Sequence, residues 1–350
     1  MTDDSDQPSD RLRERAAESR WKLWLLLEAD RRLVVAGFVA AVFAVLLVSG
    51  LLYPTAEGSI RTSDSVDTVF QGFLTATITG VTLVLTLNQL VLSQELGAVG
   101  DQRERMRGAM EFRSDAADLI DASVSPARPA QFLRALVQVS ADRARDVREA
   151  ADRAGDDEAV EAVDDLVSSL TGNAEEVSAG LDDARFGEFD VISSALNFNY
   201  SWKVYAANRI RAEHGDALDD EGLEALERLT EVLELFGPAR EHFKTLYFQW
   251  ELINLSRTIL ASALPALLVS VFMVAFFNDA TYSYTLFGVE TLVPAFAAAA
   301  TVATVPFLVL LAYVLRIATV TKHTLSIGPF ILRETDEVSE VEWSDSGTHD

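Results

Sequence analysis

The stretch Thr68–Gln94, TVFQGFLTATITGVTLVLTLNQLVLSQ, contains no charged residue over 27 positions. A helix rises about 1.5 Å per residue, so about 20 such residues already cross the roughly 30 Å hydrocarbon core of a bilayer. Three further windows are equally free of charge: Leu33–Leu52, Thr258–Phe277 and Thr291–Leu315. The sequence therefore predicts an all-α, polytopic membrane protein with four transmembrane helices.

The sidedness of these spans is predicted by their flanking basic residues, which concentrate on the cytoplasmic side of membrane proteins. The two short connections, Tyr53–Asp67 and Asn278–Glu290, contain a single basic residue, Arg61. The other ends of the spans are flanked by Arg11, Arg13, Arg15, Arg20, Lys22, Arg31, Arg32, Arg103, Arg105, Arg107, Arg113, Arg316, Lys322 and Arg333. We expect a multi-pass protein of the cell (plasma) membrane with both termini in the cytoplasm.

The rest of the chain divides into water-facing segments around the spans. The segment between spans 2 and 3 is rich in Ala, Leu, Glu, Asp and Arg and poor in Gly and Pro, which favours helices. The predicted order is residues 1–32, a cytoplasmic segment with an interfacial helix; 33–94, transmembrane helices 1 and 2; 95–257, a cytoplasmic helical domain; 258–315, transmembrane helices 3 and 4; and 316–350, an acidic, disordered cytoplasmic tail.

Within the cytoplasmic domain, helical periodicity and Gly or Pro breaks predict the individual helices. Breaks are expected at Gly172-Asn173 and at Gly237-Pro238, among others. The helix after Pro238 is expected to run on into the third span, with a kink at Pro265. The predicted helices are Asp101–Ala122, Ala130–Ala154, Glu158–Ser169, Ala174–Ala184, Val191–Glu213 and Glu221–Phe236.

The second span carries a polar stripe, which we define as Thr68, Gln71, Thr75, Thr79, Thr82, Thr86, Gln89 and Ser93. At 100° per residue these eight side chains fall within an arc of about 80°, and no apolar residue of the span shares that arc. Lipid cannot satisfy hydroxyl and amide groups, so the stripe is expected to face protein or water. The candidate pore-lining residues are Gln71, Thr75, Thr79, Thr82, Thr86, Gln89 and Ser93.

Two interpretations of the stripe stay open. Several copies of the helix in a homo-oligomer could line a water-filled path, in which hydroxyls and amides replace part of an ion's hydration shell. Alternatively, the stripe is a contact between helices of a non-conducting scaffold or sensor, which recruits a soluble partner through its cytoplasmic domain. Acidic residues in the two outer connections would attract cations to a path, although an acidic chain places acids in every loop.

Composition argues against several other functions. The formal net charge is -25, which disfavours binding to nucleic acid, and there is no Cys and only four His, so no metal-ligand pattern is present. Phosphate-binding glycine loops and intramembrane charges are also absent from the sequence, so no catalytic residue, cofactor or metal is predicted and the protein is not expected to be an enzyme. An excess of acids with only four Lys among 29 basic residues predicts a halophilic, archaeal source.

Two stretches resemble a known group of proteins. They are Ile78–Leu96, ITGVTLVLTLNQLVLSQEL, and Glu241–Ser256, EHFKTLYFQWELINLS. Both resemble uncharacterised four-span membrane proteins of haloarchaea. This resemblance implies the span arrangement, and it implies no activity, ligand or site residue.

Overall fold

The computed structural model describes residues 24–25, 29–61, 63–182, 184, 189–278, 281, 284–286 and 289–323. These residues form two compact units. We call the described part of residues 109–244 the bundle unit, and the described parts of residues 24–108 and 245–322 the span unit. The helices α6 (Val99–Leu119) and α11 (Asp220–Phe276) contribute residues to both units.

Four helices are long and apolar enough to cross a membrane, which confirms the predicted fold class. They are α3 (Arg31–Leu52), α5 (Ser63–Glu95), the last part of α11, and α12 (Leu292–His323). Between them lie the short helix α4 (Ala56–Arg61) and a two-residue antiparallel pair, β1 (Thr285–Leu286) and β2 (Val289–Glu290). The helix α12 continues to His323, beyond the end predicted for the fourth span at Leu315.

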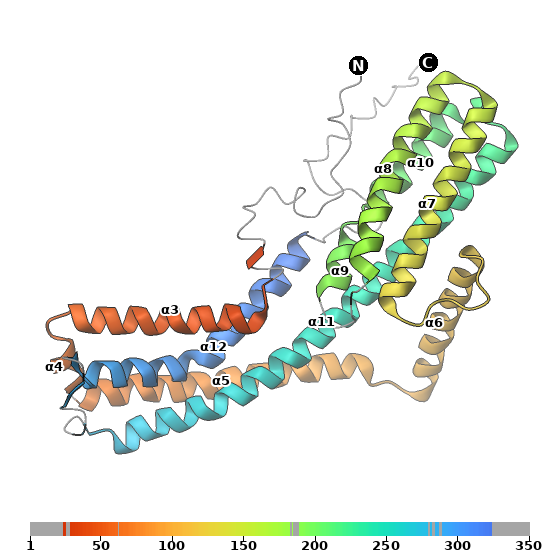
Figure 1. Cartoon of the computed structure of the whole chain (residues 1–350). Helices are drawn as coiled ribbons and strands as arrows, with labels where there is room; N and C mark the ends of the chain where they lie inside the picture. The colour runs from red at the N-terminus through yellow and green to blue at the C-terminus, as the bar shows by residue number, and fades with distance from the viewer. Residues whose placement is uncertain are drawn as a thin grey trace, which may run out of the picture. The chain divides into compact units, whose positions relative to one another are not determined.

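The four apolar helices lie lengthwise beside one another in the span unit (Figure 1). Val66 and Phe70 of α5 pack with Met273 of α11 and with Ala300 and Ala303 of α12. Further along the same helices, Val84 packs with Ile259 and Val309, and Val34 of α3 packs with Ala312. The run of alanines in α12 thus serves close helix packing, as small residues do in membrane bundles.

The bundle unit is built around an antiparallel pair of long helices, α7 (Pro129–Ala154) and α8 (Asp157–Asp182). Pro129 occupies the first turn of α7, and Gly155 ends that helix in the left-handed region at φ 73°. The Asp156 side chain then accepts a hydrogen bond from the Ala159 N–H at 2.9 Å and caps α8. These signals place a tight turn between two helices whose apolar faces share one core.

The break predicted at Gly172-Asn173 was wrong, because α8 passes through both residues. The structure instead interrupts the predicted helix Val191–Glu213, giving α9 (Phe189–Leu196) and α10 (Tyr200–His214). The two errors are connected, since the Asn173 amide donates a 2.9 Å hydrogen bond to the carbonyl of Asn197 at that interruption. The interruption also lets Phe198 enter the core with none of its surface exposed.

The break predicted at Gly237-Pro238 was also wrong, because α11 runs from Asp220 to Phe276 without interruption. Gly237 has a packing role there. A Cβ atom at this position would lie 2.9 Å from ring atoms of Tyr200, so only glycine admits the aromatic ring. Most of residues 1–32, where an interfacial helix was predicted, lies outside the described residues. The acidic tail after His323 lies outside them as well.

Candidate functional site

The helix α5 packs against its own unit with one face only. Its buried residues are Val66, Phe70, Thr77 and Val84, each with at most 1% of its surface exposed. By helical geometry these four lie within roughly 40° of one another and about 180° from the middle of the polar stripe. The face that carries the stripe is therefore the one turned away from α11 and α12.

All eight residues of the polar stripe are exposed. The structure brings the seven predicted pore-lining residues together on one side of one helix, from Gln71 near its start to Ser93 near its end. None of them is covered by another span of the same chain. Exposed apolar side chains flank the stripe on both sides: Ile78, Leu85 and Leu92 on one, and Leu83 and Leu90 on the other.

The hydroxyl groups of the stripe donate to the backbone of their own helix. Thr68, Thr75, Thr79, Thr82 and Thr86 each donate to the carbonyl four residues earlier, at 2.6 to 3.1 Å, and Ser93 donates to Leu90 at 2.7 Å. A hydroxyl has one hydrogen, so its oxygen retains only accepting capacity toward the outside. The hydroxyls of the stripe therefore present hydrogen-bond acceptors along the exposed side of α5, while the amides of Gln71 and Gln89 can both donate and accept.

Two neighbouring amides near the C-terminal end of α5 differ in their surroundings. Asn88 is half-buried, and its side-chain oxygen lies 2.7 Å from the Ser256 hydroxyl of α11, which can donate to it. Gln89 is exposed within the stripe. Asn88 thus belongs to the packed face of the helix, and Gln89 belongs to the outward face.

The opposite end of the span unit carries charged residues of the two short connections. Arg61 of α4 donates to both carboxylate oxygens of Glu290 of β2 at 3.2 Å. A side-chain hydrogen bond with Glu290 raises the pKa of Glu57, with smaller contributions from desolvation and from the negative charge of Glu290, while Arg61 opposes the shift.

Sequence reasoning missed a second polar feature, which we call the arginine clasp and define as Arg31, Arg316, Glu251 and Tyr247. Arg316 donates to the Ala29 carbonyl at 3.0 Å and lies 3.8 Å from the Glu251 carboxylate, with both side chains less than 10% exposed. Tyr247 donates to Glu251 at 3.5 Å, and Arg31 donates to the Ala312 carbonyl at 3.5 Å. The clasp joins α3, α11 and α12 at the ends predicted to be cytoplasmic.

A signal for the clasp was present in the sequence. Glu251 is the single acidic residue between Glu241 and Asp279, within a segment that becomes strongly apolar. Such an acid is costly to bury without a partner, so it predicts a buried cation nearby. The position of that cation, more than 60 residues away in either direction along the chain, depends on helix packing.

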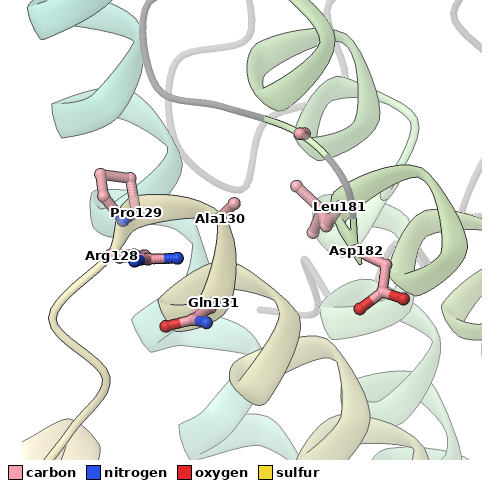
Figure 2. Close-up of a pocket in the computed structure, with 7 residues that line it drawn as sticks. Arg128, Pro129, Ala130, Gln131, Leu181 and Asp182 are labelled. Atoms are coloured by element: carbon pink, nitrogen blue, oxygen red, sulfur yellow. The ribbon is translucent and has the colours of Figure 1, made fainter.

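The bundle unit contains a cavity of about 530 Å³ (Figure 2). Arg128, Pro129, Ala130 and Gln131 line it at the start of α7, and Leu181, Asp182 and Ala184 line it at the end of α8. Asp182 pairs with Arg134, so its charge is already matched. The described lining residues bring no nucleophile and base together, and the described part of the chain holds no group of three metal-binding side chains.

Aromatic residues contribute to the core of the bundle unit. The rings of Phe198 and Phe236 meet with centroids 4.8 Å apart, and Arg240 lies over the Tyr200 ring at 4.8 Å from its centroid. Lys203 is fully buried, with its amine 5.2 Å from the centroid of the Phe198 ring. These contacts stabilise the bundle unit by aromatic and cation–π packing.

The chain belongs to the DUF7972 family, a family of unknown function, which matches residues 1–345. No curated protein and no solved structure matches the chain. The family assignment therefore covers nearly the whole sequence and adds no activity to the geometry described above.

Proposed function

We propose that this protein is a homo-oligomeric, channel-like protein of the cell membrane, with a water-lined path along α5. The observation that carries the proposal is the position of the polar stripe, exposed along the length of α5 on the side opposite its packed face. In a bilayer, such a face needs protein or water, and the other spans of the same chain do not supply it. Copies of α5 around a central axis satisfy this requirement.

The same proposal places both termini and the middle helical segment in the cytoplasm, because the basic flanking residues lie on those ends of the spans. Its partners are the lipid bilayer and further copies of the chain, and we assign it no nucleic-acid ligand and no enzymatic reaction. The acidic, Lys-poor composition supports a halophilic, archaeal source.

A second candidate function is a non-conducting scaffold or sensor, whose cytoplasmic bundle recruits a soluble partner. The hydroxyl hydrogen bonds favour it, because six stripe residues already donate to their own helix and so do not require water. In this case the stripes of two chains meet in a dry helix contact. Polar contacts between membrane helices are worth about 0.6–2 kcal/mol each, enough to hold such an assembly.

Replacing Thr79, Thr82 and Thr86 together by Val distinguishes the two functions, because valine keeps the side-chain shape and removes three outward-facing oxygens. Ion flux is measured from proteoliposomes in molar KCl, and oligomer size by light scattering. We expect the triple variant to change the flux while the oligomer persists. Thr77→Val is the matched control, because Thr77 lies in the same helix on its packed face.

The competing outcomes are distinct. A triple variant that dissociates into smaller species supports the helix-contact function. A wild-type oligomer that is folded and passes no ion contradicts the channel and shifts the assignment to the scaffold, after which cytoplasmic partners are sought by pull-down from cell extracts.

A further inference from the structure

The helix α5 begins earlier than the apolar span does. It starts at Ser63, so Asp64 lies in its first turn. The Thr68 hydroxyl donates to the Asp64 carbonyl at 2.6 Å, the i to i−4 spacing of a continuous helix. The charge-free window that defined the span began at Thr68 and so excluded this acid from the helix.

The register places Asp64 on the polar stripe. Four residues before Thr68 corresponds to a rotation of about 40°, which falls inside the roughly 80° arc of the stripe. Asp64 is exposed there, as the stripe residues are. Asp67, one residue before Thr68, lies about 100° away from it and outside the arc, and it is only half-exposed.

We propose that Asp64 makes the path along α5 selective for cations over anions, as a ring of carboxylates at its outer mouth. This inference rests on the proposed channel function and names the ion class for the same path. Rings of acidic side chains confer cation selectivity on pores because they raise the local cation concentration and repel anions. The stripe below continues the same preference, because its hydroxyl oxygens face outward as acceptors.

Arg61 and the macrodipole of α5 are the two other electrostatic features near Asp64. Arg61 could oppose the carboxylate ring, but its guanidinium contacts both oxygens of Glu290 at 3.2 Å, so its charge is matched. An acid in the first turn of a helix also stabilises the helix macrodipole, without any role in permeation. Only Asp64 lies in the first turn of α5, and the macrodipole effect acts on the stability of the helix, so a measurement of the K⁺/Cl⁻ permeability ratio separates it from a role in permeation.

The test measures the K⁺/Cl⁻ permeability ratio of reconstituted oligomers across an about tenfold KCl gradient. We expect the wild-type protein to prefer K⁺, and Asp64→Asn to lower the ratio by at least about tenfold, the smaller end of electrostatic focusing effects. Asp64→Glu keeps the charge and should keep the ratio. Asp67→Asn removes an equal charge outside the arc and should change the ratio by less than about twofold.

The possible results distinguish a failure of Asp64 as the selectivity residue from a failure of the proposed channel function. If wild-type protein conducts but prefers Cl⁻, or Asp64→Asn conducts with an unchanged ratio, the inference is overturned and the channel stands. If no folded oligomer conducts, both are overturned. Asp64→Ser provides a second neutral variant for the case in which the Asn variant does not assemble, since Ser suits the start of a helix.

Discussion

The polar stripe and the arginine clasp are two polar regions of the span unit, and their side chains have opposite surroundings: those of the clasp are mostly buried and those of the stripe are exposed. In the clasp, Glu251 and Arg316 are buried together and Arg316 also reaches a backbone carbonyl. In the stripe, uncharged side chains are exposed, and none of the other helices that the structure describes covers them. Polar groups that find hydrogen-bond partners within one chain stabilise its fold. Polar groups exposed on a membrane-spanning helix instead require water or another protein chain as a partner.

Within the span unit, the residues that stabilise the fold are therefore different from the residues expected to act in function. The clasp joins the ends of α3, α11 and α12, whose other contacts are apolar. The stripe contributes nothing to that packing, since the opposite face of α5 makes it. Substitutions in the clasp should therefore act on folding, and substitutions in the stripe on assembly and conduction.

The largest effect on stability is expected from Glu251→Ala. This change leaves the buried guanidinium of Arg316 without its carboxylate, and breaking a buried ion pair from one side costs about 3–5 kcal/mol. The free energy of unfolding is measured by denaturing-detergent titration of the purified protein. The matched control is Glu104→Ala, which removes an exposed carboxylate from the same unit and should cost less than about 0.5 kcal/mol. An equal decrease in the free energy of unfolding in the two variants would mean that the clasp does not stabilise the protein.

A smaller effect of opposite sign is expected from Thr77→Val. The Thr77 hydroxyl is buried, and among the described residues its oxygen has no hydrogen-bond partner. Removing an unsatisfied buried hydroxyl while keeping the shape should raise the free energy of unfolding by about 1 kcal/mol. Thr79→Val, two residues away on the stripe, should leave that free energy nearly unchanged, because its side chain is exposed and takes no part in the packing of α5. A destabilised Thr77 variant would mean that its hydroxyl is satisfied after all.

The four spans could be predicted from the sequence because the absence of charge over a helix-length window is a local property. The stripe could be predicted for the same reason, since its spacing within one helix fixes its direction. The start of α5 at Ser63 could not, because it precedes the charge-free window that begins at Thr68. Because this first turn of α5 was not predicted, Asp64, the one acidic residue of the helix within the arc of the polar stripe, was left outside the predicted span.

The clasp and the helix breaks depended on contacts between distant parts of the chain. Arg31 and Arg316 were counted as flanking charges that orient the spans, and nothing local joined them to Glu251. Gly172 and Gly237 were taken as breaks, whereas the packed faces of α8 and α11 outweigh the roughly 1 kcal/mol cost of glycine in a helix. Tertiary packing decided each case against the local preference.

The smallest expected effect concerns Glu57, which lies on α4 and not on the stripe. The hydrogen bond with Glu290 raises the pKa of Glu57, so this carboxyl gains a proton at a higher pH than an ordinary one as the solution is acidified. The contact stabilises the protein below the pKa that Glu57 has in the unfolded chain, and this stabilisation is lost as pH rises through the folded value. The negative charge of Glu57, which attracts cations, depends on pH in the opposite sense: it is lost as pH falls and regained as pH rises. We expect the K⁺ preference of the wild type to begin to fall on acidification at a higher pH than an ordinary glutamate would produce. Permeability ratios of wild type and Glu57→Gln are compared across pH, and the variant should lack this early fall. Superimposable profiles would place Glu57 outside the conducting surface and leave Asp64 as the acid that sets the ratio.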